Sequence, residues 1–413
     1  MKYGCIGEHL GHSFSKEIHA ALAPYKYEIC EIERDKLASF MEMRDFSAIN
    51  VTIPYKEAVI PHLYYISESA KAIGAVNTIV NRNGKLYGYN TDHYGMSALI
   101  NRMGLELSDK KVAVLGTGGT SKTAVRVALD MGAGEVIRTS RSGKDGALTY
   151  EELYAKHSDV QIIINTTPSG MYPHPEGMPI ELEKLPKVCG VVDAVYNPLR
   201  TRLVNEARKR GIKAEGGLYM LVAQAVRASE IFLDTKYSPE ETERVYRKVL
   251  SEKENIVLVG MPASGKTTVG TLLSKILGRR LIDTDAEIVK EEKVEITQIF
   301  EQIGESGFRD IEERIIRNNI LSLSSSIIAT GGGAVLRDSN IDALKQNGKL
   351  YFLDRPLEKL IPTEDRPLAS TAEAIKKRYN ERYKRYCAVC DTRICGDLTP
   401  EESAEIIIKE HTT

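Results

Sequence analysis

The chain has 413 residues, about twice the length at which a single hydrophobic core stops growing, so two or three domains are expected. Hydrophobic residues make up 42% and charged residues 27%, a globular composition that excludes a disordered chain. The formal net charge of −1 excludes a basic surface for nucleic acid or an anionic membrane. No apolar run approaches the roughly 18 residues that span a bilayer, and no signal peptide is evident, so we expect a cytoplasmic protein with small-molecule partners.

Cysteine usage agrees with a cytosolic chain. Six cysteines are too few and too irregularly spaced for a disulfide framework. Cys387, Cys390 and Cys395 lie close together and leave a metal site as an alternative, but a fourth ligand with suitable spacing is missing. Reduced thiols are the preferred interpretation.

The first hundred residues contain four short polar motifs, each where a predicted strand meets a loop. These are residues 11–15 (GHSFS) with His19 shortly after, residues 50–56 (NVTIPYK), residues 74–78 (GAVNT) and residues 89–92 (YNTD). Polar side chains that recur at strand ends are candidates for a binding site.

Residues 112–121 (VAVLGTGGTS) predict a strand, a glycine-rich loop and the start of a helix that ends at Gly132. This unit opens a dinucleotide-binding fold, although Ser121 stands where a third glycine is usual. About twenty residues beyond the loop, where an acidic residue would bind the ribose of NAD, the chain has Arg141 with Lys144 nearby. A cation there favours the 2′-phosphate of NADP; the alternative is an arginine on a solvated strand end.

Three further motifs follow this loop: residues 165–167 (NTT), 193–198 (DAVYNP) and 217–224 (GLYMLVAQ). Together with the earlier motifs they closely resemble shikimate dehydrogenase over residues 1 to about 250. The resemblance implies a substrate-binding lobe of residues 1–100, completed by residues 217–250, and a Rossmann-type NADP lobe of residues 101–216. It also implies NADPH-dependent reduction of 3-dehydroshikimate to shikimate.

The resemblance assigns roles to single residues. Lys56 and Asp92 would be the catalytic pair, which is chemically sensible because a ketone reduced by hydride needs a proton donor. The substrate would be bound by Ser13, Ser15, Thr52, Asn77, Asp92 and Gln224. NADP would be bound by Gly116, Gly118, Gly119, Thr120, Ser121, Ser140, Arg141, Thr166 and Gly217. By themselves Lys56 and Asp92 would be a structural salt bridge. Lys16 departs from the family, which commonly has proline there.

Between the two glycine loops, residues 238–241 (SPEE) have the N-cap serine, first-position proline and capping glutamate of a helix start. They predict a charged helix that runs to about Leu250. Residues 251–255 are then the expected linker.

Residues 256–259 (IVLV) lead into residues 260–267 (GMPASGKT), a phosphate-binding loop in its required context between a strand and a helix. The helix is expected to end near Leu277, before Gly278. In such a loop Lys266 reaches the β- and γ-phosphates and Thr267 ligates Mg²⁺. The motif predicts phosphoryl transfer from a nucleoside triphosphate but does not identify the acceptor.

Downstream motifs identify the acceptor. They are residues 283–285 (DTD), 304–309 (GESGFR) with Glu312, 331–333 (GGG), 365–368 (DRPL), and Arg382 four residues before Tyr386. In this order and spacing they closely resemble shikimate kinase over residues 256–413. The resemblance implies an α/β domain with a parallel sheet and ATP-dependent phosphorylation of shikimate to shikimate 3-phosphate.

Lys266 and Asp285 would be the catalytic residues of this second unit, and Thr267 and Asp283 the Mg²⁺ ligands. ATP would be bound by Gly260, Ala263, Ser264, Gly265, Lys266, Thr267, Thr268 and, on a mobile lid, Arg366. Shikimate would be bound by Asp285, Arg309, Gly331, Gly332, Gly333 and Arg382. Taken singly, Asp283 is equally a helix cap and the two arginines equally surface ion pairs. Lys384 stands where the family usually has proline, and residues 354–366 are short for a lid.

The sequence therefore predicts a bifunctional enzyme that uses NADP(H), Mg²⁺ and ATP, as a monomer or homodimer. Two alternatives are a non-catalytic sensor of pathway ligands, and a quinate/shikimate dehydrogenase using NAD fused to a small-molecule kinase. Lys56, Asp92, Lys266 and Asp285 argue against the sensor, and Arg141 argues against NAD.

Overall fold

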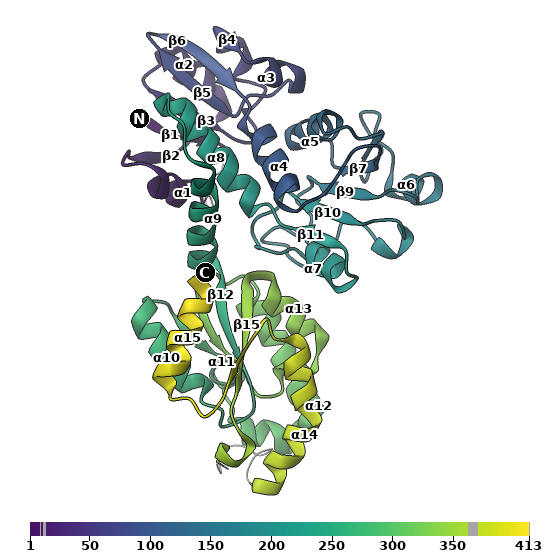
Figure 1. Cartoon of the computed structure of the whole chain (residues 1–413), viewed down its shortest axis with the longest axis vertical. Helices are drawn as coiled ribbons and strands as arrows, with labels where there is room; N and C mark the ends of the chain where they lie inside the picture. Colours follow the sequence, from purple (N-terminus) through teal and green to yellow (C-terminus); the bar gives the residue numbers. More distant parts are fainter. Residues whose placement is uncertain (9, 11–13, 362–370, 413) are drawn as a thin grey trace. The chain divides into compact units, whose positions relative to one another are not determined.

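A computed structural model describes residues 1–8, 10, 14–361 and 371–412 (Figure 1). By its internal contacts the chain divides into two compact units, Met1–Val249 and Leu250–Thr413. Both units consist of β-sheets covered by helices, which confirms the predicted α/β class.

The first unit begins with a mixed six-stranded sheet in the order β2-β1-β3-β5-β6-β4. The three strands β2, β1 and β3 are parallel, whereas β5 is antiparallel to both β3 and β6. The strands are β1 (Tyr3–Gly7), β2 (Tyr27–Glu31), β3 (Ala48–Val51), β4 (Tyr65–Ile66), β5 (Thr78–Arg82) and β6 (Lys85–Tyr89). The helices are α1 (Ser15–Leu22), α2 (Leu37–Met43) and α3 (Glu68–Ile73).

A second, fully parallel sheet of five strands follows, in the order β11-β10-β9-β7-β8. From β7 the chain goes to β8 on one side and later to β9 on the other, so the topological switch point, where ligands bind in open α/β sheets, lies at the carboxyl end of β7. The strands are β7 (Lys111–Leu115), β8 (Glu135–Thr139), β9 (Ile162–Asn165), β10 (Gly190–Asp193) and β11 (Lys213–Glu215). The helices are α5 (Gly119–Asp130), α6 (Tyr150–Lys156) and α7 (Arg202–Lys209).

Three longer helices link these parts of the chain. Helix α4 (Thr91–Arg102) packs against α8 (Leu218–Leu233) and α5, and Ala228 and Phe232 of α8 pack on the first sheet (Figure 1). Helix α9 (Pro239–Lys253) starts at the predicted proline but runs three residues past Leu250. Since β12 begins at Asn255, the expected linker of residues 251–255 is mostly helix, and this prediction needs correction.

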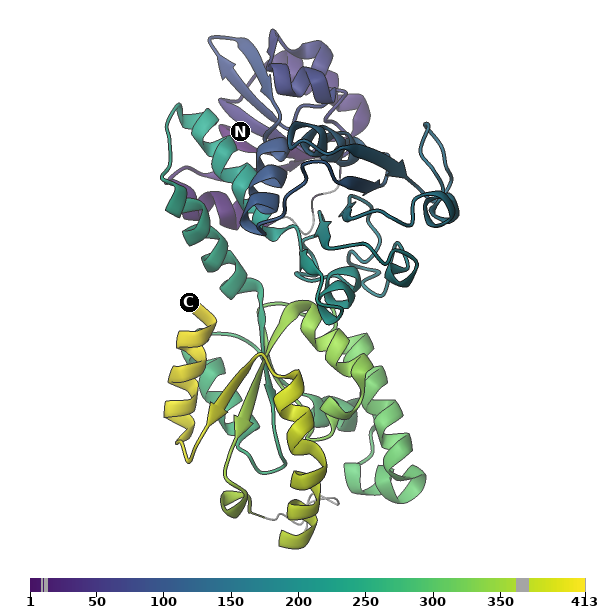
Figure 2. The ribbon, with the colours of Figure 1, turned by 45° about the vertical axis from the view of Figure 1, so that its right-hand side comes forward.

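The second unit contains one parallel sheet in the order β13-β14-β12-β15-β16, with β12 at its centre. Helices α10 and α15 lie on one face and α13 and α14 on the other, as two views show (Figures 1 and 2). The strands are β12 (Asn255–Val259), β13 (Leu281–Asp283), β14 (Ile327–Ala329), β15 (Gly348–Asp354) and β16 (Thr392–Cys395). The helices are α10 (Lys266–Leu277), α11 (Thr284–Glu292), α12 (Ile296–Ile315), α13 (Asp338–Asn347), α14 (Ala372–Val389) and α15 (Pro400–Thr412).

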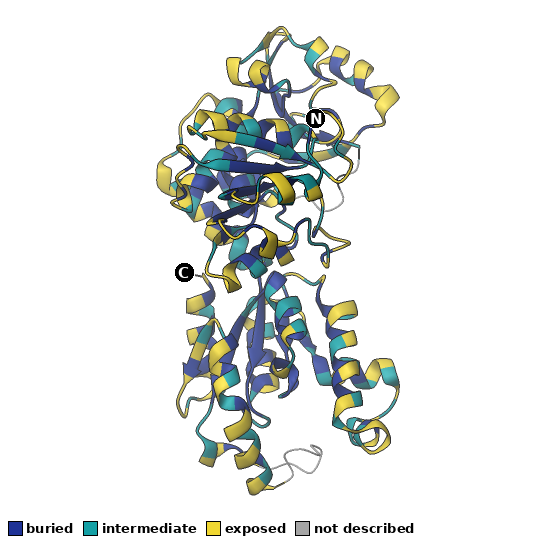
Figure 3. Ribbon diagram, turned by 90° about the vertical axis from the view of Figure 1, so that its right-hand side faces the viewer, coloured by how far each residue is buried: buried dark blue, intermediate teal, exposed yellow. Residues whose placement is uncertain are grey.

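The interior strands β7 and β12 are buried on both faces, which explains their uninterrupted apolar sequences (Figure 3). Because side chains alternate along a strand, Val257 and Val259 enter the core that includes Ile341 of α13, whereas Ile256 and Leu258 enter the core that includes Leu273 of α10. Fully buried sheets of this kind hold the loops at their carboxyl ends in fixed positions.

Candidate active sites

The two predicted catalytic residues of the first unit form an ion pair. Lys56 lies in the loop after β3, and Asp92 lies in the first turn of α4, whose N-terminus is capped by the side chain of Asn90. Lys56 Nζ is 2.6 Å from Asp92 Oδ2, with side chains 15% and 12% exposed. The pair is nearly buried, so the carboxylate holds the ammonium in one place while a path to it stays open.

Two predicted substrate ligands, Asn77 and Gln224, are hydrogen-bonded to Thr91 at the start of α4. The sequence analysis assigned no role to Thr91. Asn77 Oδ1 accepts hydrogen bonds from Thr91 N at 2.7 Å and from Thr78 Oγ1 at 3.1 Å. Because its oxygen is used in this way, the Asn77 amide nitrogen is left as the group that can donate to a ligand. Thr91 Oγ1 is also 3.2 Å from Gln224 Oε1, which brings in a residue 133 positions away.

For the remaining predicted substrate ligands, the structure gives their position in the fold and their burial. Thr52 follows β3 and Ser15 opens α1, and both are half-buried; Ser13 lies outside the described residues. The Phe14 ring packs 5.3 Å from that of Tyr196, which follows β10. His19 is buried and stacked on Tyr27, and burial lowers its pKa to about 3, so this histidine is a neutral packing residue.

The glycine loop after β7 fits a nucleotide at two of its glycines. A Cβ at Gly118 or Gly119 would meet no atom within 4 Å, so the backbone there is open to a ligand. Gly116 instead has φ of +110° and lies so close to Thr166 that a Cβ would be 2.8 Å from its hydroxyl. The Ser121 hydroxyl donates to Gly116 O at 2.6 Å and therefore closes the loop from inside.

The other predicted NADP residues divide into packed and open positions. Thr166 Oγ1 donates to Leu115 O at 2.6 Å, and a Cβ at Gly217 would be 2.3 Å from Ala194 O, so both contribute to the local packing. Ser140 Oγ accepts from Gly143 N at 3.1 Å. Arg141 is exposed at the end of β8 and Thr120 is half-buried. A cation next to an open glycine loop suits a phosphorylated ribose.

In the second unit, the loop between β12 and α10 curls tightly. Gly265 has φ of +90°, and Gly260 has φ of +154°, with Leu353 O only 2.9 Å from where its Cβ would be. Lys266 Nζ donates to Gly260 O at 3.0 Å and Met261 O at 2.9 Å, so the lysine covers the loop's own carbonyl groups. The open amides at the start of α10 then face the ligand side.

Thr267 and Asp283 meet at the mouth of this loop. Thr267 Oγ1 donates to Asp283 Oδ2 at 2.9 Å, while Asp283 Oδ1 caps α11 by accepting from Asp285 N at 3.0 Å. Asp283 is thus a helix cap that still presents a carboxylate oxygen beside a hydroxyl, and these hard oxygen ligands suit Mg²⁺.

The three clustered cysteines near the C-terminus were the alternative metal ligands. Within the part of the chain that the structure describes, no group of three or more His, Cys, Asp or Glu side chains is arranged to hold a metal ion. Cys387, Cys390 and Cys395 are free thiols.

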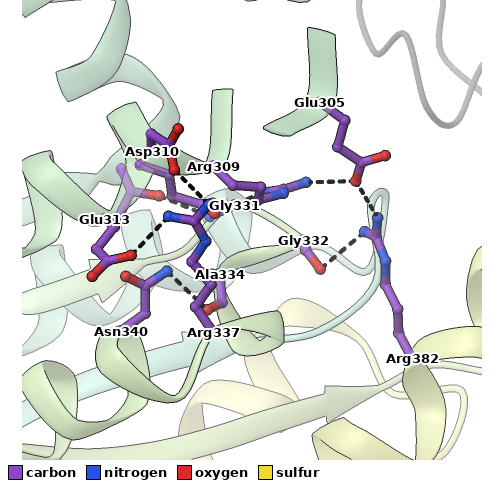
Figure 4. A network of polar contacts seen from close by, with 12 residues as sticks. Glu305, Arg309, Asp310, Glu313, Gly331, Gly332, Ala334, Arg337, Asn340 and Arg382 are labelled. Carbon is purple, nitrogen blue, oxygen red and sulfur yellow. Dashed lines mark hydrogen bonds and ion pairs between the residues drawn. The ribbon is translucent and has the colours of Figure 1, made fainter. Parts of the chain in front are cut away.

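Opposite the phosphate loop, two arginines flank the triple glycine (Figure 4). Arg382, from α14, donates to Gly332 O at 3.2 Å, and Arg309, from α12, donates to Glu312 Oε2 at 2.7 Å. Both guanidinium groups are nearly buried and both contact Glu305, to which the sequence reasoning gave no role. They are therefore not the surface ion pairs considered as the alternative.

Each of the three glycines makes room for a neighbouring side chain. A Cβ at Gly331 would be 2.5 Å from Asp285 Oδ1, and one at Gly333 would be 2.1 Å from the Arg309 guanidinium. A Cβ at Gly332 would be 2.9 Å from Pro262 of the phosphate loop. The glycines thus let the acidic group, the arginine and the phosphate loop converge.

Glu312 is fully buried beneath this cluster. Burial raises the pKa of its carboxyl to about 7, against the opposing effect of Arg309. Its Oε1 has no hydrogen-bond partner among the described residues and lies beside Gly331. Glu312 holds the Arg309 guanidinium in place by accepting its hydrogen bond. The only sequence signal for Glu312 was its position shortly after the GESGFR motif.

A pocket of about 350 Å³ joins these groups. Its lining includes Lys266 and Thr267 of the phosphate loop, Asp283 and Asp285, and both Arg309 and Arg382, with Phe300 and Phe308 as apolar walls. A second pocket of about 400 Å³ extends from Thr268 along α10 to Pro400 and Glu401. Arg366 lies outside the described residues. The first pocket has the size and polarity for a small anionic polyol beside a phosphate.

Within the described residues, no helix has the length and apolar character that crossing a bilayer requires.

Comparisons with known proteins agree with this division of the chain. The model of the shikimate dehydrogenase substrate binding domain matches residues 5–79, and the model of shikimate kinase matches residues 262–412. The chain is 37% identical over 261 residues to shikimate dehydrogenase (NADP(+)) of Clostridium beijerinckii, which covers 59% of this chain and 96% of that relative.

Solved structures give the same result for the first unit. Shikimate dehydrogenase 1 from Peptoclostridium difficile is similar with a TM-score of 0.56 and 34% identity, covering 60% of this chain and 98% of that one. The shikimate 5-dehydrogenase of Thermus thermophilus, solved in complex with NADP(H) and shikimate, is similar with a TM-score of 0.54 and 28% identity, covering 60% of this chain and 99% of that one. The chain belongs to the shikimate dehydrogenase family through its first unit, carries a shikimate kinase domain in its second, and is a fusion of the two.

Proposed function

We propose that this chain catalyses two consecutive reactions, the NADPH-dependent reduction of 3-dehydroshikimate to shikimate and the ATP-dependent phosphorylation of shikimate to shikimate 3-phosphate. The first reaction is assigned to residues 1–250, with residues 1–100 and 217–250 as the substrate lobe and residues 101–216 as the NADP lobe. The second is assigned to residues 256–413. Membership of the two families supports this proposal, and the first product is the second substrate.

In the reduction, bound NADPH supplies the hydride to the ring ketone. Lys56 donates the proton that the developing alkoxide requires, and Asp92, 2.6 Å away, holds the ammonium in place. Asn77, through the amide nitrogen that its hydrogen bonds leave available, orients the substrate oxygens together with Thr52 and Gln224. Ser13 and Ser15 bind the carboxylate.

For the cofactor, the open backbone at Gly118 and Gly119 and the N-terminus of α5 hold the pyrophosphate. The exposed Arg141 pairs with the 2′-phosphate, which is the basis for preferring NADP to NAD. Gly116, Ser121, Thr166 and Gly217 keep this surface in shape, since their contacts are made within the protein.

In the phosphorylation, Lys266 moves from its loop carbonyl contacts to the β- and γ-phosphates, and Thr267 with Asp283 holds Mg²⁺. The nucleoside end of ATP extends into the second pocket, beside Thr268 and Pro400. Asp285 binds the ring hydroxyls and accepts the proton of the attacking one. Arg309 and Arg382 grip the carboxylate, and Arg366 covers the phosphates.

One observation carries the kinase half of this proposal. A single pocket is lined both by the phosphate loop and by the arginine pair, with Asp285 between them. A phosphate donor and a small hydroxy acid bound there would lie in one pocket, which is the proximity that direct transfer requires.

The test is an assay of the purified full chain with 3-dehydroshikimate, NADPH and Mg²⁺-ATP, in which NADPH loss and ADP formation are followed separately. We expect NADPH loss first, then ADP formation as shikimate accumulates. Added shikimate should give ADP without NADPH. NADPH loss with no ADP under either condition would disprove the kinase assignment, and the reverse would disprove the dehydrogenase assignment.

A further inference from the structure

Glu305 is placed where three arginines converge. It follows Gly304, whose φ of +70° and ψ of −176° interrupt helix α12, so the carboxylate stands at the start of the second half of that helix. Glu305 Oε1 lies 3.5 Å from Arg309 Nη2 and 3.4 Å from Arg382 Nη2 (Figure 4). Its other oxygen is 3.7 Å from Arg378.

These contacts are loose compared with those of the neighbouring glutamate. Charge-assisted hydrogen bonds between guanidinium and carboxylate groups are about 2.7–2.9 Å long. Glu312 meets that standard, at 2.7 Å from Arg309 and with a side chain that is 0% exposed. Glu305 is longer in every contact and its side chain is 37% exposed. Glu312 is thus the permanent partner of Arg309, whereas Glu305 is held weakly and can move into solvent.

Arg382 depends on Glu305 for a neutralising carboxylate more than Arg309 does, because Arg309 also pairs with Glu312. In the described part of the chain, Glu305 is the only carboxylate within ion-pair distance of Arg382. The Arg382 guanidinium also donates to the carbonyl of Gly332. The side chain is 3% exposed, and burial together with Arg309 and Arg378 lowers the Arg382 pKa, so a negative group is required beside it.

We propose that Glu305 is a specificity-determining residue, a displaceable internal carboxylate that occupies the arginine pair until a substrate carboxylate replaces it. This inference rests on the proposed function, because it takes Arg309 and Arg382 as the carboxylate-binding groups of the kinase. A carboxylate ligand must displace Glu305 and work against its negative charge.

The consequence is selection against incomplete ligands. A ring hydroxy acid recovers the cost of displacing Glu305 through contacts of its hydroxyls with Asp285 and the triple glycine. A plain ring carboxylate has only its contacts with the two arginines to offset this cost. Displacing Glu305 costs both ligands the same free energy, so the ligand with additional hydroxyl contacts still binds, whereas the affinity of the plain carboxylate becomes too low to compete.

The test compares Glu305→Gln with Glu301→Gln, a matched change at an exposed glutamate one turn earlier on the same helix. The probe is cyclohex-1-enecarboxylate, a ring carboxylate without hydroxyl groups, titrated calorimetrically into the full chain without ATP. Glu305→Gln should bind it about tenfold more tightly than wild type. Because shikimate displaces the same carboxylate, its KM should fall by a similar factor, and kcat should stay the same. Glu301→Gln should match wild type in all three.

Unchanged probe affinity in Glu305→Gln would overturn the proposal, as would weaker binding, which would make Glu305 a rigid support for the arginines. Thermal unfolding of each variant shows that the comparison is between folded proteins. Glu305→Asp retains the charge and should keep the wild-type selectivity against the probe; tight probe binding by this variant would also contradict the proposal. If wild type does not phosphorylate shikimate, the proposed function fails separately, since probe binding is measured without catalysis.

Discussion

The loops after β7 and β12 occupy comparable places, each at the carboxyl end of the strand that comes first along the chain in a parallel sheet. They differ in where the positive charge comes from. The loop after β12 carries its own cation, Lys266, which sits folded over the loop carbonyls. The loop after β7 is followed at the same spacing by Lys122, but Lys122 Nζ pairs with Glu57 Oε1 at 2.7 Å. Ser121 closes this loop from inside, and the predicted cation for the ligand, Arg141, comes from the end of the next strand.

The difference reflects the chemistry proposed for each loop. Phosphoryl transfer develops charge on the phosphate itself, so the cation belongs in the loop that holds the phosphate. A dinucleotide pyrophosphate is only anchored, and backbone amides with a helix N-terminus are sufficient. Removing a cation should accordingly stop catalysis in the second unit but only weaken or redirect cofactor binding in the first.

The largest expected effect is in Lys266→Ala. We expect kcat of the kinase reaction to fall about 10⁴-fold, because the charge that stabilises the transferring phosphoryl group is lost. NADPH oxidation should be unchanged. Lys377→Ala, an exposed lysine on α14, is the control. An equal loss of both activities in a folded protein would show that the sites are not independent.

Lys56→Ala should have the next largest effect and the opposite selectivity. Loss of the proton donor should lower kcat for reduction about 10³-fold while ADP formation from added shikimate is retained. Asp92→Asn tests the pair itself: Lys56 then lacks the carboxylate partner at 2.6 Å that positions it, so reduction should fall. If both variants retained reduction, Lys56 and Asp92 would form a structural salt bridge and not a catalytic pair.

A pH-dependent stability is expected in the second unit. Burial raises the pKa of Glu312 from 4.5 to about 7, so between these values the folded state holds a proton that the unfolded state has lost. Its contribution is therefore full below pH 4.5 and is lost as the pH rises to 7, by about 2–3 kcal/mol at most.

Calorimetric unfolding of the full chain from pH 5 to 8 measures this contribution. Glu312→Gln should flatten the slope. Glu313→Gln is the control and should leave the slope between pH 5 and 8 unchanged. A hydrogen bond from Arg337 lowers the Glu313 pKa from 4.5, so the contribution of Glu313 is lost only as the pH falls below this range. Identical slopes in wild type and Glu312→Gln would show that burial does not shift this carboxyl.

The smallest effect is expected at the exposed Arg141. Arg141→Ala should raise the KM for NADPH about tenfold and leave that for NADH unchanged, because only NADPH carries the 2′-phosphate. Arg126→Ala, an exposed arginine on α5 paired with Asp130, is the control. An equal loss for both cofactors would place Arg141 elsewhere on the nucleotide.

Local structure was predictable because it depends on residues that are neighbours in sequence. Strand β12, the loop and the helix ending at Leu277 follow from an apolar run, two glycines and a C-terminal glycine. The same holds for β7, its loop and α5. The end of α9 was missed, because Ser251, Glu252 and Lys253 carry no helix-stopping signal and the helix continues almost to β12.

By itself the sequence determined the α/β class, the order of the two families along the chain and the residue types that carry chemistry. Only the tertiary structure decided which of them meet. Thr91 is hydrogen-bonded both to Asn77 and to Gln224 on helix α8. Glu305 lies between Arg309 and Arg382, and Arg382 is 77 residues away from Glu305 in the sequence. The physical reason is that such contacts depend on how sheets and helices pack, so their geometry is set by the folded core and leaves no periodic signal in the local sequence.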